Sequence, residues 1–482
     1  MPKFITGLRW TALLLLAALL LGGCGGRARS AAPASTATAT AAPTPAGHDD
    51  QVPIVLRFFT TEADPQQIAV LQDLIAEYQI DHPDIDIDIV LASPTHRERR
   101  LLTALASGID LGIFEIEPVL MTNWAEAGYL LPLDDVAAAI GLDDYTPGSL
   151  FVHNGHVYAL PYSASIYGLW VRKDLFEAAG LPLPTTYEDV LAAAEALTAG
   201  DVYGIALPAG QNIATVNYFS TFLWQNGGDY FSCDGEVVFG RPEALEAVKR
   251  WAELARYAPP GFTTWGYREQ IDAFIQGRVA MSLYGGRLGV NLAEEAPELA
   301  DDVTVIFPPW GPEQATLGVW SRLAIAAGAE HQAEAKEFLG WLLSGDRLLR
   351  FDMTVPGHMI PPLRSVQEAS LAYQSPYIEQ HRDWIASFYK WAPYASHPAM
   401  NMGVIRDGRF APSETPPPWA EAVFEPPGVI DAMLQEIALT DRDPEEAWRE
   451  AVMKMEEAVR EWKRQHPEWE PPQCEKIGEI GD

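Results

Sequence analysis

Residues 54–59, Ile-Val-Leu-Arg-Phe-Phe, begin the pattern that decides the fold. A short and mostly apolar run of this kind is typical of a strand buried in a parallel sheet. Apolar residues then recur at a helical spacing over residues 68–78, which predicts a helix with one buried face. Over residues 85–91 apolar residues alternate with aspartate, which predicts a second strand with one solvated face.

The same order of strand and helix continues along the chain. Residues 97–107 predict a helix that stops at Gly108, and residues 111–116 predict a strand. Residues 119–127 predict a helix that stops at Gly128. Strands that alternate with helices form a parallel sheet covered by helices, so the sequence predicts an α/β fold.

The N-terminal residues have the features of a bacterial export signal. Two cations precede an apolar run over residues 10–21, which is too short to be a comfortable membrane-spanning helix. The Leu-Gly-Gly-Cys at residues 21–24 resembles the lipobox of bacterial lipoproteins. We therefore expect residues 1–23 to be a lipoprotein signal peptide and Cys24 to carry the lipid. An ordinary secretory signal that ends in cysteine is the alternative.

Residues 24–51 are rich in alanine, threonine and proline and are expected to form a disordered tether. A lipid followed by a tether would hold the folded body at a membrane surface on the extracytoplasmic side, periplasmic or cell-surface. No other stretch approaches about 18 uninterrupted apolar residues, so the sequence predicts no other membrane span.

The charge of the chain excludes one class of partner. Its 482 residues include 33 lysines and arginines against 66 aspartates and glutamates, for a formal net charge of −33. So acidic a chain repels phosphate backbones, and the sequence contains no basic patch, so nucleic acid is excluded. The length favours two domains.

The search for catalytic motifs is negative. The sequence has no G-x-S-x-G, no P-loop and no G-x-G-x-x-G after a strand, which argues against nucleophile-elbow hydrolases and nucleotide binding. His153 and His156 flank a turn glycine without a nearby cysteine or histidine to complete a metal site. We therefore expect no enzymatic activity, no metal and no cofactor.

Aromatic residues outside the obvious core pattern indicate a ligand site. Trp and Tyr combine a rigid apolar face with a polar edge, which suits stacking on a sugar ring. For any single residue packing is the simpler explanation, but several lie at strand ends or beside Gly and Pro, where α/β sheets bind ligands. The candidates are Phe59, Trp124, Tyr162, Tyr167, Trp224, Tyr230, Trp265, Tyr284, Trp310, Trp320 and Trp419.

Several segments resemble a known family in their order and spacing. The most specific are Gly-His-Val-Tyr-Ala-Leu-Pro at 155–161 and Leu-Trp-Val-Arg-Lys-Asp-Leu-Phe at 169–176. Further matching segments are 101–108, 127–134, 179–189, 274–281, 318–326 and 335–339. Over roughly residues 52–462 the chain resembles the extracellular solute-binding proteins (family 1) of sugar-type ABC importers, the superfamily of maltose-binding protein.

The resemblance implies a two-lobed periplasmic-binding-protein fold of type II, the Venus-flytrap fold, in which each lobe is a sheet flanked by helices. It implies a monomer that captures a carbohydrate between the lobes and delivers it to the transmembrane permease subunits of an ABC importer. The implied boundaries are 52–161 plus 319–360 for lobe one, 162–318 plus 361–465 for lobe two, and 466–482 for a C-terminal tail.

The resemblance also assigns ligand-binding positions. Some of these positions follow the first strand, and others occupy the loop where the family places an acid against sugar hydroxyls. The remaining positions lie at the crossings between the lobes or after the strand at 279–285. The assigned positions are Phe59, Thr60, Thr61, Glu115, Glu117, Tyr162, Ser165, Trp224, Tyr284, Arg287 and Trp320.

The sequence departs from the family pattern at two places. Val171 and Arg172 stand where the family has Tyr-Asn before Lys-Asp. Gly285, Gly286 and Arg287 stand where the family has Gly-x-Trp, whose Trp often stacks on sugar. An arginine there favours a polar or acidic ligand, or a sugar whose hydroxyls accept hydrogen bonds from the guanidinium.

Two other functions stay open, a surface glycoside hydrolase and a non-transport solute sensor or adhesin with the same fold. The cysteines other than Cys24 also leave two possibilities. Cys233 and Cys474 could form one disulfide in an oxidising compartment, which would tie the tail to lobe two, or remain free thiols.

Overall fold

The computed structural model describes residues 53–60, 65–91, 97–116, 118–146, 149–232, 235–398, 404–406, 409–411, 417–440 and 442–470. Val52–Asp482 forms one compact unit. The predictions for the signal peptide, Cys24 and the tether lie outside the described residues. Among the described residues, no helix has both the length and the apolar character needed to cross a membrane.

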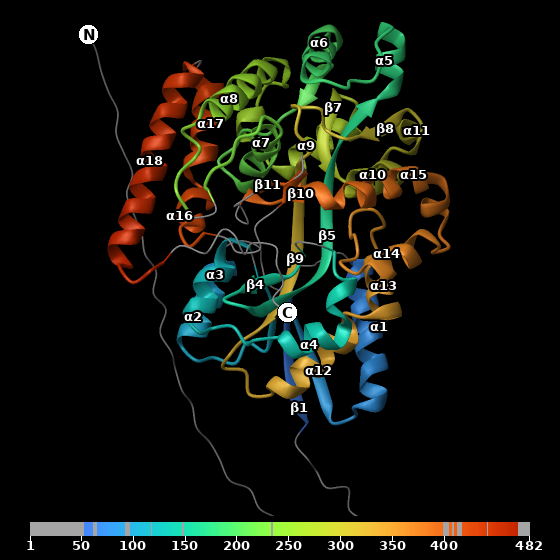
Figure 1. The fold of residues 1–482 in the computed structure, drawn as a ribbon. Coiled ribbons are helices and arrows are strands. Elements are labelled where there is room, and N and C mark those ends of the chain that lie inside the picture. Colours follow the sequence, from blue (N-terminus) through green and yellow to red (C-terminus); the bar gives the residue numbers. More distant parts are fainter. Residues whose placement is uncertain are drawn as a thin grey trace, which may run out of the picture. The chain divides into compact units, whose positions relative to one another are not determined.

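The first half of the unit alternates strands and helices (Figure 1). The strands are β1 (Ile54–Thr60), β2 (Ile85–Leu91), β3 (Ile113–Ile116), β4 (Phe151–His153), β5 (His156–Arg172) and β6 (Tyr203–Ala206). The helices are α1 (Pro65–Asp81), α2 (Arg97–Ala106), α3 (Pro118–Glu126), α4 (Asp134–Ile140), α5 (Lys173–Ala179), α6 (Tyr187–Leu197) and α7 (Ile213–Gln225).

The second half contains more helix. Its strands are β7 (Val279–Gly285), β8 (Val303–Ile306), β9 (Thr316–Ile325), β10 (Ala395–Ser396), β11 (Val404–Arg406) and β12 (Arg409–Ala411). Its helices are α8 (Pro242–Leu254), α9 (Tyr267–Ile275), α10 (Arg287–Glu295), α11 (Pro297–Ala300), α12 (Gln332–Leu342), α13 (Gly345–Asp352), α14 (Arg364–Leu371), α15 (Pro376–Trp391), α16 (Ala420–Phe424), α17 (Val429–Thr440) and α18 (Pro444–Gln465).

The predicted strands at 54–59 and 85–91 are confirmed as β1 and β2, which pair in parallel, and β3 pairs in parallel with β1. Every second residue of β1 is buried, because alternate side chains of a strand point to one face. On that face Phe58 meets the edge of Phe338 from α12, with ring centroids 6.3 Å apart. Burial of such a side chain contributes about 1.5–3 kcal/mol. The hydrophobic pattern of the sequence therefore determines which face of the sheet α1 and α12 cover.

The sheet is mixed rather than fully parallel. Its order is β2-β1-β3-β9-β5-β7-β6. β9 runs antiparallel to both β3 and β5, and β7 runs antiparallel to β5. The parallel sheet predicted from the first strands is thus correct for β1, β2 and β3 only, since β9 returns from 150 or more residues away to lie beside β3 and β5.

Two long strands join the halves of this sheet. The first part of β5 pairs with β9 over 160–166, and its last part pairs with β7 and β8 over 167–172. A third segment lies alongside, since Ala164 and Ile360 exchange backbone hydrogen bonds of 2.8 and 2.9 Å. The fold is therefore two-lobed, with three chain segments that meet between the lobes.

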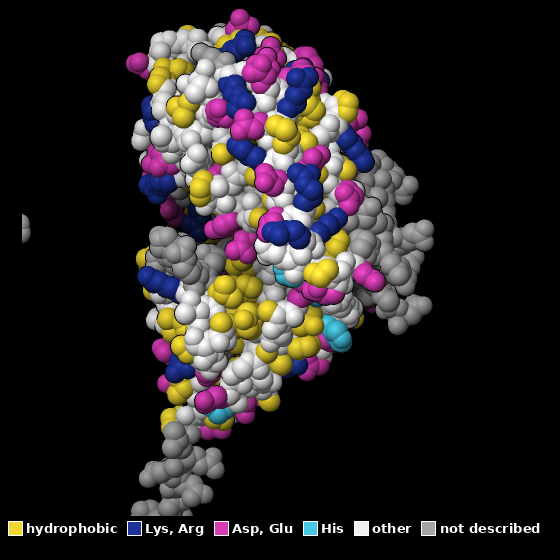
Figure 2. All heavy atoms as spheres, turned by 90° about the vertical axis from the view of Figure 1, so that its left-hand side faces the viewer, with side chains coloured by type: hydrophobic (Ala, Val, Ile, Leu, Met, Phe, Trp, Pro, Cys, Tyr) yellow, Lys and Arg dark blue, Asp and Glu magenta, His cyan; other side chains and the backbone are white. Residues whose placement is uncertain are grey.

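The surface mixes charges of both signs. On the face shown in Figure 2, Lys and Arg side chains are interspersed with Asp and Glu. On α18 these charges pair at helical spacing, as between Glu445 and Arg449, Glu450 and Lys454, and Glu456 and Arg460. The described cations of this helix are thus matched by neighbouring acids instead of forming a basic surface.

Candidate functional site

Ligands of open α/β sheets bind outside the carboxyl ends of the strands, where the strand order changes direction. In this fold β1 ends at Thr60 and β7 ends at Gly285, and β5 and β9 pass between them. We call the polar residues gathered around these strand ends and crossings the crossing site. Its members are Thr60, Glu115, Tyr162, Ser165, Tyr284, Arg287 and His358.

The first part of the crossing site is a carboxylate held by two hydroxyls. In the parallel register Phe59 lies opposite Phe114, which places the next residues, Thr60 and Glu115, side by side. Thr60 Oγ1 donates a hydrogen bond to Glu115 Oε1, and the Tyr162 hydroxyl donates to the same oxygen at 3.2 Å. Glu115 is only 8% exposed. Charged acceptors strengthen such hydrogen bonds, so these donors fix the carboxylate in one orientation.

A small cavity adjoins this carboxylate. It has a volume of about 10 Å³ and is lined by Thr60, Glu115 and Tyr162 together with apolar side chains such as Phe351. That volume is enough for about one water molecule. The carboxylate end of the crossing site is therefore nearly closed beside the ends of β1 and β3.

The second part is a serine–histidine contact at the crossing strands. Ser165 Oγ lies 3.1 Å from His358 Nδ1. The pairing of Ala164 with Ile360 brings these two residues together. Burial, with a smaller contribution from the charge of Arg287, lowers the pKa of His358 to about 3. The imidazole is therefore neutral at neutral pH, with one nitrogen that donates and one that accepts.

Four tyrosines pack together near the end of β7. Tyr167 lies 5.5 Å from Tyr284 and 5.8 Å from Tyr218, measured between ring centroids, and Tyr267 lies 6.1 Å from both Tyr218 and Tyr284. Burial raises the pKa of Tyr284 to about 12, against the opposing charges of Arg287 and Arg268. Its hydroxyl therefore stays protonated and can donate a hydrogen bond.

The last residue of β7 and the residue that follows it are glycines, and a side chain on either would clash with its neighbours. A Cβ atom on Gly286 would lie 1.9 Å from the carbonyl oxygen of Gly357, and one on Gly285 would lie 2.5 Å from Ser165 Oγ. Arg287 follows as the first residue of α10 and is half-buried. Its charge acts on both Tyr284 and His358, so its guanidinium belongs to the same electrostatic environment.

Together these groups can both donate hydrogen bonds to the hydroxyl groups of a ligand and accept hydrogen bonds from them. Glu115 accepts hydrogen bonds, Arg287 donates them, and Tyr284, Ser165 and neutral His358 can do either or both. A ligand with many hydroxyls needs this mixture, because each of its buried hydroxyls must keep a donor or an acceptor.

Comparison with known sequences decides the family. The family described as bacterial extracellular solute-binding protein matches residues 63–346. The chain belongs to this family. The resemblance seen in the sequence is therefore confirmed.

Relatives of this solute-binding protein are distant. The Escherichia coli protein YcjN, named as an ABC transporter periplasmic-binding protein, is 25% identical over 66% of this chain and 75% of its own length. The mannitol-binding protein of Pseudomonas aeruginosa is 28% identical over 57% of this chain and 66% of its own length. A solute-binding protein of Thermotoga lettingae, crystallised with α-D-tagatose, has a TM-score of 0.70 at 21% identity and covers 84% of this chain and all of its own. That likeness confirms the two-lobed fold.

The structure of this family member brings some of the sequence-predicted residues into contact, in two groups. Thr60, Glu115 and Tyr162 share direct hydrogen bonds, and Tyr284 and Arg287 interact electrostatically. Trp320 lies on β9 opposite Ala164, and only 5% of it is exposed. Thr61, Glu117, Cys233 and Cys474 lie outside the described residues.

Two sequence-predicted residues belong to the packed interior. Phe59 is partly buried and packs against the main hydrophobic core. Trp224 is 0% exposed in α7, a helix in which every residue from Ala214 to Gln225 is buried. Its ring therefore presents no free face to a ligand in this structure, and its role here is packing.

Sequence reasoning missed His358. Its contact with Ser165 spans 193 positions along the chain. No local pattern marks such a residue, since only the third crossing segment brings it to β5. Tyr167 was found through its aromatic character, whereas Tyr218 and Tyr267 look like ordinary helix residues in sequence.

Within the part of the chain that the structure describes, no three His, Cys, Asp or Glu side chains are grouped so that they could hold a metal ion.

Proposed function

We propose that this protein is the substrate-binding lipoprotein of an ABC importer. It captures a sugar or polyol in the crossing site, and closure of the lobes traps the ligand. The lobes comprise 52–161 plus 319–360 and 162–318 plus 361–465. The lipid on Cys24 anchors the monomer outside the cytoplasm, where it delivers its ligand to the permease subunits.

One observation carries this proposal. The crossing site joins one carboxylate, one guanidinium and several neutral hydroxyl and imidazole groups at the strand ends between the lobes. Relatives named for mannitol and maltotriose, and a structural neighbour holding tagatose, support polyhydroxylated ligands as the class. Glu115 is the one carboxylate among the described residues of the crossing site, whereas glycoside hydrolysis uses a pair of carboxyl groups. We therefore propose binding without catalysis.

The proposal is tested by binding to a panel of sugars and polyols that includes mannitol, tagatose and maltotriose. A ligand that binds only the folded state raises the melting temperature, and calorimetry then gives its Kd. We expect saturable binding of at least one compound and no change in that compound after long incubation. A panel without any binder would contradict the proposal, and release of hydrolysis products would establish the glycoside hydrolase instead.

The site is tested by Glu115→Gln. This change keeps the shape of the side chain but removes the charge that Thr60 and Tyr162 orient. A hydrogen bond to a charged group contributes about 1.5–3 kcal/mol, so we expect the affinity to fall about 10- to 100-fold. Glu195→Gln makes the same change on the exposed face of α6 and serves as the control. An unchanged Kd for Glu115→Gln would place the ligand elsewhere.

A further inference from the structure

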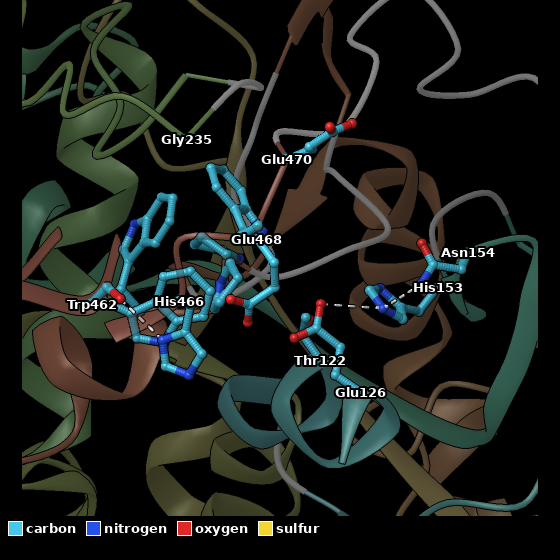
Figure 3. A pocket seen from close by; sticks show the side chains of 13 residues that line it. Thr122, Glu126, His153, Asn154, Gly235, Trp462, His466, Glu468 and Glu470 are labelled. Atoms are coloured by element: carbon cyan, nitrogen blue, oxygen red, sulfur yellow. Dashed lines mark hydrogen bonds and ion pairs between the residues drawn. The ribbon is translucent and has the colours of Figure 1, made fainter. Parts of the chain in front are cut away.

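A second cavity lies outside the crossing site and shares none of its residues. It has a volume of about 380 Å³, within the range of ligand pockets. Its walls come from α3, the turn between β4 and β5, the start of α16 and the end of α18 (Figure 3). The lining residues are Thr122, Glu126, His153, Asn154, Gly235, Pro417, Pro418, Trp419, Trp462, His466, Glu468, Trp469 and Glu470. We call it the tryptophan cavity.

Three tryptophans form one wall of the tryptophan cavity. Trp419 lies 5.2 Å from Trp469 and 5.7 Å from Trp462, measured between ring centroids, in edge-on geometry. Trp462 stacks on His466 at 4.0 Å. Trp419 and Trp469 also lie 5.4 Å from the ammonium of Lys463. The wall is thus rigid, and its rings already accommodate one ammonium group.

Trp419 contributes packing to the wall, since the residue is 1% exposed. Its indole nitrogen Nε1 lies below the surface and has no hydrogen-bond partner among the described residues. The surface that the wall offers to a ligand is therefore that of the half-buried Trp462 and Trp469.

Acidic side chains also border the cavity. Figure 3 shows Glu126 from α3 and Glu468 from beyond α18 reaching toward the same space. Burial raises the pKa of Glu126, with His466 lowering it and the charge of Glu468 raising it further. The ion-pair partner of Glu126 is His153 at 3.6 Å, but burial lowers the pKa of that histidine and favours its neutral form.

Lys463, which lies over the tryptophan rings, is paired with a different acid. Lys463 forms an ion pair with Glu236 at 2.8 Å, on the side of the tryptophan rings. Glu126, Glu468 and Glu470 thus line the cavity with no described lysine or arginine paired to them. An ammonium group placed between Glu126 and Glu468 would relieve their mutual repulsion.

We propose that the tryptophan cavity is a second binding site, for an amino sugar. Its ammonium group lies between Glu126 and Glu468. The apolar face of the ring packs on Trp462. The cavity differs from the crossing site in its excess of carboxylates over cations, and the proposal does not depend on what the crossing site binds.

Calorimetric titration of the full-length protein with glucosamine, glucose and N-acetylglucosamine tests the ligand class. We expect saturable binding of glucosamine and at least tenfold weaker binding of the other two, which lack the ammonium. Equal affinity for all three would overturn the amino-sugar assignment, because it would show that the affinity does not depend on the ammonium charge. Absence of glucosamine binding would overturn the site.

Variants show where glucosamine binds. Glu126→Gln and Glu468→Gln each remove one carboxylate from partly exposed positions, so both variants are expected to fold, and each should weaken glucosamine at least tenfold. Glu421→Gln, on the exposed side of α16 outside the cavity, is the matched control and should leave the affinity unchanged. Glu115→Gln in the crossing site should also leave it unchanged. If Glu115→Gln lost affinity for glucosamine and Glu126→Gln did not, glucosamine would bind in the crossing site. That result would overturn this proposal and leave the proposed function intact.

Discussion

Substitution of Gly286 by alanine tests how the three crossing segments fit together. Gly286 has φ −60° and ψ −20°, which any L-residue adopts, so the backbone itself would not resist the change. The added Cβ would instead lie 1.9 Å from the oxygen and 2.2 Å from the carbon of the Gly357 carbonyl, and 2.7 Å from the amide nitrogen of His358. All three atoms are backbone, so no side chain can rotate away.

The magnitude follows from this geometry. Overpacking a well-packed interior costs about 1–3 kcal/mol, and occasionally more. Because relief here requires the backbone at 357–358 to move, we expect a loss of about 3 kcal/mol in the free energy of unfolding. The same movement would carry His358 away from Ser165, so the affinity for the crossing-site ligand should fall as well.

The measurement is denaturant unfolding, followed by a Kd determination under conditions where the variant is folded. Gly340→Ala is the matched control, because its Cβ would meet only Val136 Cγ1 at 3.4 Å inside α12. Glycine to alanine in a helix interior stabilises by about 0.5–1 kcal/mol. If the free energy of unfolding of Gly286→Ala stayed within about 0.5 kcal/mol of the wild-type value and its affinity were unchanged, Gly286 would not lie so close to the Gly357 backbone, and the reasoning would be refuted.

Two further predictions concern Gln225 and the two cysteines other than Cys24. The buried amide of Gln225 makes four hydrogen bonds of 2.6–3.1 Å to the backbone of residues 308–315. Gln225→Leu should therefore lower the free energy of unfolding by about 3 kcal/mol or more. A loss below about 1 kcal/mol in denaturant unfolding would contradict this prediction. Cys233 and Cys474 lie outside the described residues, and their disulfide stays a prediction from the sequence. If they form the disulfide, the intact mass without reductant should be lower by two hydrogens than the mass with reductant. Equal masses would mean free thiols.

The local elements could be predicted because their signals are local. Alternation at 85–91 and the helical spacing at 68–78 depend on side chains a few positions apart, and they gave β2 and α1 correctly. The order of strands could not be read in this way. β9 enters the sheet between β3 and β5, and no pattern near residues 316–325 indicates which strands will be its neighbours.

The candidate site was predictable where it adjoins those elements. Thr60 and Glu115 follow directly from two parallel strands whose ends meet, so their proximity could be inferred once the strands were located. Trp224 shows the limit of arguing from residue type. Tryptophan suits both a stacking platform and a packed core, and only the surroundings of α7, buried on all its faces, distinguish the two.

The departure from the family pattern at 285–287 bears on specificity. Gly286 cannot bear a side chain, because the Gly357 backbone occupies that space. The next residue, Arg287, stands where the resemblance leads one to expect a tryptophan, and its charge acts on Tyr284 and His358. The aromatic groups that remain nearby are tyrosines, of which Tyr284 is protonated and can donate a hydrogen bond. A site with more hydrogen-bonding groups and fewer open ring faces favours small, densely hydroxylated ligands over long stacked oligosaccharides, so monosaccharides and polyols should bind more tightly than maltotriose in the proposed panel.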